Sequence, residues 1–209
     1  MKKDQCKICR RLGVKLFLKG ERCFSPKCAM IKRPYAARPK RKRSSRGFSE
    51  YGREMREKQK LKAWYNLGER QFRRYVRETL TRGKKTEDFA LVLIKILESR
   101  LDNVIFRLGI ASSRTQARQM VSHRHFLVNG RPVNISSYLV KKGDKIALSA
   151  PASKKIGFAG LSASLKKKPA IAWLALNAEK VEAEVIGEPT FEEAAPPADI
   201  SLIFAFYSK

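Results

Sequence analysis

Residues 100–146, RLDNVIFRLGIASSRTQARQMVSHRHFLVNGRPVNISSYLVKKGDKI, contain the pattern that decides the fold of this chain. Apolar residues recur at spacings of three and four before Gly109, which predicts one buried helical face that ends at this glycine. Ser113 and Gln116 then form a capping-box pattern, which predicts a second helix over residues 113–122. The first apolar face comprises Leu97, Leu101, Val104, Ile105 and Leu108.

A hairpin is expected directly after the second helix. Asn129-Gly130 lies between apolar residues, and this dipeptide is the strongest short-range signal for a two-residue hairpin turn. A turn over residues 142–144 precedes a further predicted strand, Lys145–Leu148. We therefore expect two short helices packed on a short β-sheet, with six arginines on the outside: Arg100, Arg107, Arg114, Arg118, Arg124 and Arg131.

The charge of the chain points to a polyanionic partner. The 209 residues include 46 Lys or Arg and 19 Asp or Glu, which gives a formal net charge of +27. A free soluble enzyme seldom carries so much unneutralised charge, because self-repulsion destabilises the compact state. Since 43% of the residues are hydrophobic, the chain still has enough apolar side chains for a core. Nucleic acid is therefore the expected partner.

The four cysteines lie near the amino end, as Cys6-x2-Cys9 and Cys23-x4-Cys28. Short pairs of this kind let thiolates from two turns reach one metal and complete the four-sulfur shell that structural zinc prefers. We expect one structural Zn2+ that folds a knuckle over residues 1–31. An iron–sulfur cluster would use the same ligands, and two disulfides are the other alternative, which a reducing cytosol disfavours.

A basic linker is expected over residues 32–48. Residues 32–46, KRPYAARPKRKRSSR, contain two prolines and no acid, a composition that stays extended until a partner neutralises it. We expect this run to contact phosphates. Its candidate residues are Lys40, Arg41, Lys42, Arg43 and Arg46.

A helical domain is predicted over residues 49–98. Phe72, Tyr75 and Val76 share one helical face, so these side chains are expected in the core. Thr86 is the predicted N-cap of a further apolar helix, Phe89–Leu97. A basic stripe suited to a phosphate backbone runs beside the aromatic face and comprises Arg70, Arg73, Arg74 and Arg77.

Residues 100–146 resemble, along their full length, the RNA-binding module of the bacterial small-subunit ribosomal protein four family. Residues 51–78, YGREMREKQKLKAWYNLGERQFRRYVRE, are similar to the helical domain of that family. The cysteine quartet resembles its zinc-bearing subtype, and the closing FYSK its carboxyl terminus. The match is weak only over residues 154–198. This sequence departs from the family pattern at Asn66, Gly68 and Glu87, and at Arg124, which interrupts the commoner His-Gly-His.

The resemblance implies an α+β protein of two domains. The small module, residues 99–168 with its basic extension, would be inserted into a helical domain to which the acidic segment 169–209 returns. It also implies a non-enzymatic constituent of the cytoplasmic small ribosomal subunit that binds the 5′ domain of 16S ribosomal RNA during assembly. Arg41–Arg46 would line the channel through which messenger RNA enters. The other implied partner is small-subunit ribosomal protein five, at an interface that affects translational accuracy.

The candidate RNA contacts extend well beyond the basic linker. The two histidines near residue 124 lack an accompanying carboxylate or cysteine pattern, so His123 is interpreted as a phosphate contact and no catalytic residue is assigned. The full set outside the linker is Arg10, Arg11, Arg53, Lys58, Lys62, Arg70, Arg73, Arg74, Arg77, Arg100, Asn103, Arg107, Ser113, Arg114, Arg118, His123, Arg124, Asn129 and Arg131.

The last fifth of the chain is acidic and is expected to lie away from RNA. Residues 200–207 form an apolar segment with strand propensity, which predicts an edge strand or terminal segment packed on the helical domain. No apolar run approaches the roughly 20 residues of a membrane-spanning helix, and no secretory signal is expected. The acids expected to face solvent or a basic protein are Glu182, Glu184, Glu188, Glu192 and Glu193.

Two other functions compete with the ribosomal one. An RNA-modifying enzyme could carry the small module as an appendage, but it would need a separate catalytic domain that this chain has no room for. A free zinc-dependent RNA-binding protein is the other alternative. The ribosomal function requires no small-molecule substrate and no membrane.

Overall fold

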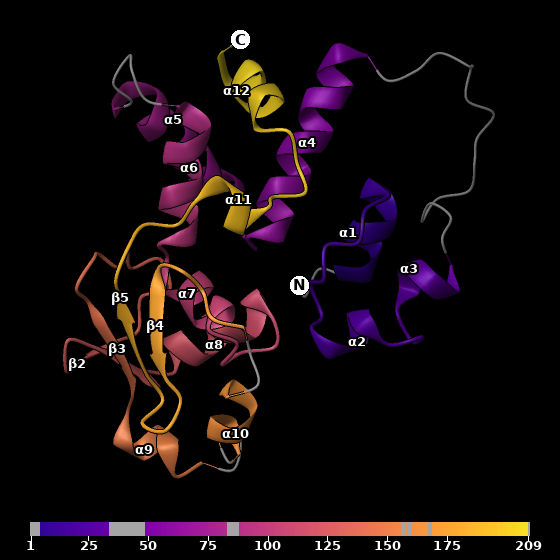
Figure 1. Ribbon diagram of the computed structural model, residues 1–209. Helices are drawn as coiled ribbons and strands as arrows, with labels where there is room; N and C mark the ends of the chain where they lie inside the picture. Colours follow the sequence, from indigo (N-terminus) through magenta and orange to yellow (C-terminus); the bar gives the residue numbers. More distant parts are fainter. Residues whose placement is uncertain are drawn as a thin grey trace. The chain divides into compact units, whose positions relative to one another are not determined.

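The computed structural model describes residues 5–33, 49–82, 88–155, 158, 160–166 and 169–208. The chain divides into two compact units, one of Met1–Leu93 with Ala195–Lys209 and one of Ile94–Ala194. Figure 1 labels most of their helices and strands. The linker candidates between Lys40 and Arg46, and the predicted cap Thr86, fall outside the described residues.

The described part of the first unit is helical. Asp88 caps α6 (Phe89–Glu98), because the Asp88 side-chain oxygen accepts a hydrogen bond from the backbone N–H of Ala90 at 2.9 Å. This helix continues beyond Leu93 into the second unit. The helices are α1 (Gln5–Leu12), α2 (Glu21–Phe24), α3 (Ala29–Lys32), α4 (Glu50–Trp64), α5 (Glu69–Arg82), α6 (Phe89–Glu98) and α12 (Ile200–Ser208).

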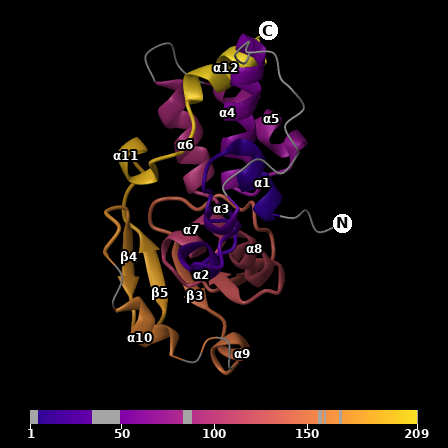
Figure 2. The ribbon, with the colours of Figure 1, turned by 90° about the vertical axis from the view of Figure 1, so that its right-hand side faces the viewer.

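The closing segment of the chain is a helix, so the predicted strand propensity of residues 200–207 is wrong. α12 lies alongside α4 in both ribbon views (Figures 1 and 2). Ile200 and Ile203 are buried, and the Phe206 ring lies 5.5 Å from that of Tyr51 on α4. Packing of residues three and four apart against α4 overrides the strand preference of the individual side chains. α12 packs on α4 within the first unit.

The second unit is built on an antiparallel sheet. Its five strands lie in the order β2-β1-β3-β5-β4. Helices α7 and α8 share one hydrophobic core with β1, β3, β4 and β5. The elements of this unit are α7 (Leu101–Arg107), α8 (Arg114–Ser122), β1 (Phe126–Val128), β2 (Arg131–Val133), β3 (Lys145–Leu148), α9 (Ala150–Ser153), α10 (Leu161–Leu165), β4 (Leu174–Asn177), β5 (Glu182–Val185) and α11 (Phe191–Ala194).

The hairpin and the cap that the sequence predicts are both present. β1 and β2 pair with Val128 opposite Arg131, and the two turn residues Asn129 and Gly130 have φ of 50° and 76°. Positive φ at both positions is what a type I′ turn requires. The Ser113 side chain accepts a hydrogen bond from the backbone N–H of Gln116 at 3.3 Å and so caps α8.

The sheet is larger than the sequence suggested. Strands β4 and β5 come from the acidic segment, and β5 pairs with β3 in the register Ile146 opposite Ala183. Ala183 and Val185 are buried while Glu182 and Glu184 are exposed. This alternation is the period-two pattern of a half-buried strand, and it is the sequence signal that could have indicated β5.

The apolar face around residue 100 belongs to two helices instead of one. α6 ends at Glu98, and Arg100 adopts an extended backbone with φ of −69° and ψ of 136°. Arg100 forms an isolated bridge with Leu139, and this pairing interrupts the helix. Leu97 and Leu101 are nevertheless both buried, as their spacing predicts. Within the described ranges, no helix is long and apolar enough to cross a membrane.

Candidate nucleic-acid interface

The basic stripe on α5 is exposed as the sequence predicts. Arg70, Arg73, Arg74 and Arg77 are largely solvent-exposed, while Phe72 and Val76 on the opposite face are fully buried. Spacings of three and four residues place the four guanidinium groups along one side of the helix. Arg74 forms an ion pair with Glu78 at 3.2 Å. This row of charges suits contact with a phosphate backbone.

A second basic surface lies at the end of α8. Backbone N–H groups of Arg124 and His125 donate to the carbonyls of Val121 and Met120, at 2.8 and 3.3 Å, in a Schellman motif. Arg124 stands at the left-handed position of this motif, with φ of 57°, and its side chain is exposed. The turn also stacks the rings of His123 and His125, whose centroids are 5.8 Å apart.

The two histidines differ in their surroundings. His123 is exposed, whereas His125 is half-buried and its ring meets Phe158 edge-on at 5.5 Å. Burial lowers the pKa of His125, and Lys155 and His123 lower it further. The fold therefore favours the neutral form of His125, which suits a structural role better than a charged phosphate contact.

The hairpin carries exposed polar and basic residues. Asn129 and Arg131 are both exposed. The Asn129 side chain donates to Asp144 at 2.8 Å and accepts from the backbone N–H of Lys145 at 2.9 Å, so it joins the hairpin turn to β3. Further exposed cations, which no local sequence pattern singled out, are Lys141, Lys142 and Lys145.

Arg100 lies inside the second unit, so the expectation that it would be on the outside is wrong. The whole residue is 0% exposed. Its guanidinium donates to both carboxylate oxygens of Asp102, at 3.0 and 2.6 Å. A buried cation requires such a partner because desolvation of an isolated charge is costly.

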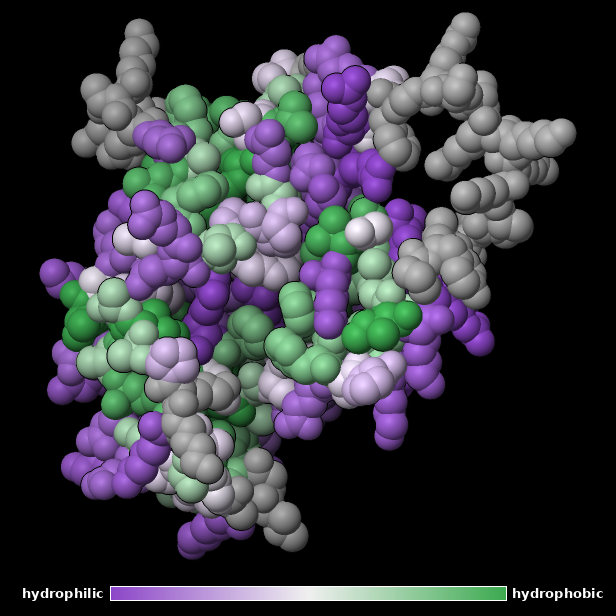
Figure 3. Space-filling model, turned by 45° about the vertical axis from the view of Figure 1, so that its right-hand side comes forward, coloured by the Kyte–Doolittle hydropathy of each residue, from purple (hydrophilic) through white to green (hydrophobic). Residues whose placement is uncertain are grey.

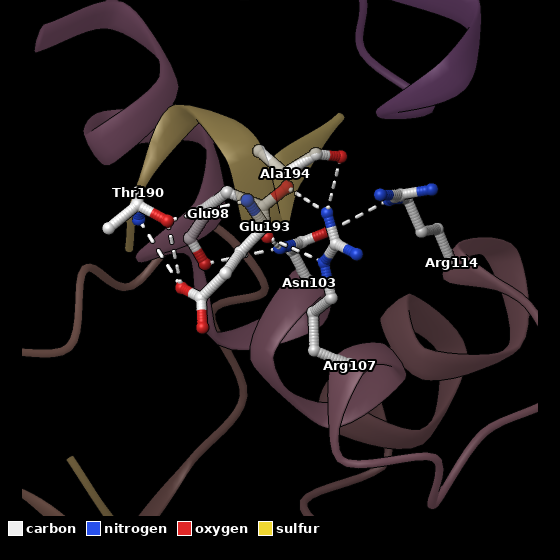
Figure 4. Close-up of polar contacts among 7 residues, drawn as sticks. All are labelled: Glu98, Asn103, Arg107, Arg114, Thr190, Glu193 and Ala194. Atoms are coloured by element: carbon white, nitrogen blue, oxygen red, sulfur yellow. Dashed lines mark hydrogen bonds and ion pairs between the residues drawn. The ribbon is translucent and has the colours of Figure 1, made fainter. Parts of the chain in front are cut away.

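Asn103, Arg107 and Arg114 belong to one polar network, drawn in Figure 4. The buried carboxylate of Glu98 accepts from Asn103 at 2.6 Å and from two nitrogens of Arg107, each at 2.8 Å. Arg107 also donates to the carbonyl of Ala194 at 3.0 Å, and Arg114 donates to the Asn103 side chain at 2.7 Å. These contacts brace α7, α8 and the end of α11 within the second unit.

Both arginines of this network were expected on the outside of the unit. The expectation is wrong for Arg114 and only partly right for Arg107. Arg114 is buried and lies over the Phe106 ring, with 4.5 Å between its guanidinium carbon and the ring centroid. Arg107 is half-buried. Asn103 and Ser113 are buried as well. Arg107 and Glu98 border a cavity of about 330 Å³ that is lined mainly by apolar residues, among them Ile171 and Trp173.

Lys58 and Lys62 converge on a single carboxylate in the first unit. Their ammonium groups lie 2.8 and 2.6 Å from the two oxygens of Glu69. Burial opposes ionisation of Glu69, but the two lysines outweigh it and lower the pKa of this carboxyl to about 2. The Tyr207 hydroxyl donates to Glu69 at 3.1 Å, and burial together with this anion raises the pKa of Tyr207 above its usual range.

The same cluster joins the end of the chain to α4. The Lys58 ammonium lies 4.3 Å from the ring centroid of Phe206. Lys58 itself is buried. Its contacts with Glu69 and Phe206 therefore serve the fold, in contrast to the exposed arginines of α5.

Figure 3 shows hydrophilic side chains over much of one face of the molecule.

The four cysteines line one cavity in the first unit. Cys6, Cys9, Cys23 and Cys28 all border it. Burial raises the pKa of the Cys9 thiol, and charge on the other three cysteines raises it further. The backbone N–H of Lys19 donates to the Cys23 sulfur at 3.3 Å. Nevertheless, in the part of the chain that the structure describes, no three or more His, Cys, Asp or Glu residues form a group arranged to hold a metal ion.

The remaining candidates vary in exposure. Arg11 and Arg53 are exposed, whereas Arg10 and Arg118 are half-buried. The sequence did not predict which acids pair with Lys58, Arg107 and Arg100. They are Glu69, Glu98 and Asp102, respectively. Only Asp102 stands close enough to its partner in the sequence, two residues from Arg100, for a local pattern to have indicated it.

Comparisons with known proteins cover nearly the whole chain. The family pattern described as "Ribosomal protein S4/S9 N-terminal domain" matches residues 1–98, and the one described as "S4 domain" matches residues 99–146. The small ribosomal subunit protein uS4 of Kosmotoga olearia is 44% identical over 98% of this chain and 96% of its own. Those of Caldicellulosiruptor bescii and Thermus thermophilus are 46% and 43% identical over the same shares. Two domains in this order and identity at this level over nearly the full length lead to one conclusion: the chain belongs to the small ribosomal subunit protein uS4 family.

Proposed function

We propose that this protein is a structural, non-enzymatic constituent of the small ribosomal subunit that binds ribosomal RNA. The exposed stripe Arg70, Arg73, Arg74 and Arg77 carries this proposal, because its opposite face is buried and the stripe is accessible to a polyanion. The names of the relatives, all small ribosomal subunit proteins, support it.

The binding mechanism that these surfaces support is recognition of the RNA backbone. Guanidinium groups on a rigid helix can contact phosphates without the cost of ordering a loop. The buried pair Arg100–Asp102 and the pair of half-buried Arg107 with Glu98 hold the second unit in shape, so its exposed His123, Arg124 and Arg131 are presented from a fixed surface. RNA helices are recognised mostly by shape and backbone, which such a rigid basic surface suits.

We further propose the 5′ domain of 16S ribosomal RNA as the target, on the family resemblance. The same resemblance supports contacts of Arg41–Arg46 with messenger RNA where it enters the subunit, and a contact with small-subunit ribosomal protein five that affects accuracy. The acidic segment suits a basic protein neighbour, because Glu182, Glu184 and Glu192 are exposed.

A structural Zn2+ held by Cys6, Cys9, Cys23 and Cys28 is also proposed. The donor set fits, since four thiolates are a common shell for structural zinc and all four residues border one cavity. When bound, the ion would crosslink α1 to the segments around Cys23 and Cys28 and supply no catalytic chemistry. Its binding requires the sulfur atoms to form a ligand shell that the described residues do not display in their present arrangement.

Filter binding of the full-length chain tests the proposal. The probes are a transcript of the 16S 5′ domain and a structured transcript of equal length from the large-subunit RNA, each over a range of salt concentrations. We expect preference for the first transcript and a steep linear fall of log affinity with log salt. Equal affinity for both transcripts would contradict the specific target, and salt-independent or absent binding would contradict RNA binding altogether.

A further inference from the structure

Two exposed phenylalanine rings are stacked on each other in the first unit. Their centroids are 5.0 Å apart and their planes differ by 28°. Phe17 is 38% exposed, and Phe24, the last residue of α2, is 72% exposed. Single exposed hydrophobic residues are common on protein surfaces, but here two aromatic rings are stacked together and both remain accessible to solvent, Phe24 largely so.

The backbone that presents these rings is unusual. Phe17 has φ of 52°, in the left-handed region that bulky side chains rarely adopt. Gly20 follows with φ of 57° and leads directly into α2, which ends with Phe24. Strained conformations of this kind persist where the surrounding structure holds them, and they cluster at binding sites. The turn from Phe17 to Gly20 therefore places an aromatic ring at a position that the local chain preferences alone would not produce.

Basic residues lie close to the stacked rings, Lys15 by contact and others by their position in the sequence. The Lys15 ammonium lies 5.0 Å from the centroid of the Phe17 ring. Lys19, Arg22 and Lys27 are exposed, and Glu21 is the one acid in the sequence of residues 15–27. Aromatic faces set among cations are the combination that binds single-stranded nucleic acid, because bases stack on the rings while the cations meet phosphates.

We propose that the Phe17–Phe24 pair, called here the phenylalanine platform, stacks on an unpaired RNA base. The inference rests on the proposed RNA-binding function and adds to it a contact with a base, where the arginine surfaces contact the backbone. The open side of Phe24 receives the base, and Lys15, Lys19 and Lys27 neutralise the neighbouring phosphates. An apolar protein surface is the less favoured occupant, because it would leave these cations without counter-charge.

The test measures affinity of full-length variants for the 16S 5′-domain transcript. Phe24→Leu keeps apolar bulk but removes the aromatic face, and Phe24→Tyr keeps that face. Ile31→Ala is the matched control, since Ile31 is an exposed apolar residue of the same unit, 55% exposed. We expect Phe24→Leu to weaken binding about 5- to 100-fold, and Phe24→Tyr and Ile31→Ala to bind as the wild type does.

Two further readouts separate stacking from other effects. Phe24→Leu should leave the slope of log affinity against log salt unchanged, because that slope reports phosphate contacts. Ultraviolet crosslinking followed by peptide mass spectrometry should attach a nucleotide at Phe17 or Phe24. The melting temperature and metal content of each variant show whether the fold around Cys23 is retained. If Phe24→Leu changes either of them, Phe24→Tyr is the folded variant with which its affinity is compared.

The outcomes that overturn the inference differ from those that overturn the function. If the wild type binds the transcript and Phe24→Leu binds it with the same affinity, the phenylalanine platform is rejected while the proposed RNA binding stands. An equal loss in Ile31→Ala and Phe24→Leu would mean a general apolar contact and would also reject it. If the wild-type chain fails to bind RNA, the proposed function fails and the inference fails with it.

Discussion

Arg100 and Asp102 form a bidentate ion pair inside the second unit, with hydrogen bonds of 3.0 and 2.6 Å. Their side chains are 1% and 6% exposed. Removal of either partner deprives a buried charge of this ion pair, so Asp102→Asn or Arg100→Ala should lower the free energy of unfolding by about 3–5 kcal/mol. Urea unfolding followed by circular dichroism measures this change.

The control for this prediction is Arg131→Ala, which removes an exposed arginine from the same unit. It should change the free energy of unfolding by no more than about 0.5 kcal/mol. A loss in Asp102→Asn as small as that in Arg131→Ala would show that the buried pair does not support the fold.

Arg124 gives a prediction of opposite sign. Its φ of 57° at the end of α8 is a conformation that glycine adopts without steric cost. Arg124→Gly should therefore raise the free energy of unfolding by about 1 kcal/mol, measured by urea unfolding. Arg118→Gly, in the interior of the same helix, should lower it by about 1 kcal/mol. A loss of stability in Arg124→Gly would contradict the assigned role of this turn.

Glu69 predicts a loss of stability in acid. The folded-state pKa is lowered to about 2 from an ordinary value of 4.5, so the stabilisation is fully present above pH 4.5. It is lost as the pH falls from 4.5 through about 2, because protonation removes the charge that Lys58 and Lys62 contact. Thermal melting across this range should show a smaller acid-induced drop for Glu69→Gln than for the wild type. Identical pH profiles would count against this cluster.

The arginine stripe of α5 predicts a change in salt dependence. Arg73→Gln combined with Arg77→Gln should weaken binding to the 16S 5′-domain transcript and reduce the salt slope by about one for each phosphate that is no longer neutralised. Lys180→Gln, which removes an exposed charge from the acidic segment, is the control. If Lys180→Gln reduces the slope equally for each charge removed, net charge and not the stripe determines binding.

If the four cysteines bind zinc, the metal should stay with the protein through purification. The purified chain should contain one zinc per molecule, and Cys9→Ser should release it because one of four thiolates is removed. Native mass spectrometry and elemental analysis measure the metal. Full zinc occupancy in Cys9→Ser, or iron with sulfide in the wild type, would reject the zinc proposal.

Local sequence signals predicted α8 and the strands β1, β2 and β3 of the second unit, but not β4 and β5. Asn129-Gly130 fixes the hairpin, Ser113 caps α8, and Gly109 follows the end of α7 with φ of 78°. Each signal acts within a few residues, so neighbouring positions in the sequence are enough to reveal it. The exposed stripe of α5 was predictable for the same reason, since helical periodicity separates Arg73 from Phe72.

Long-range partners limited the prediction of site residues. Arg107 contacts Glu98 and also the carbonyl of Ala194, 87 residues away, and no local pattern reveals such a contact. Arginines that pair internally and arginines that are exposed look alike in a basic sequence. The helix at the end of the chain was missed because packing against α4, and not the preference of its side chains, determines its conformation.

Crosslinking of the protein to RNA in cells, followed by sequencing of the attached RNA, tests the central claim most directly. A constituent of the small ribosomal subunit that binds the 5′ domain should give reads mostly from small-subunit ribosomal RNA, concentrated in that domain. Reads scattered over many transcripts, or concentrated in transfer RNA, would contradict this role.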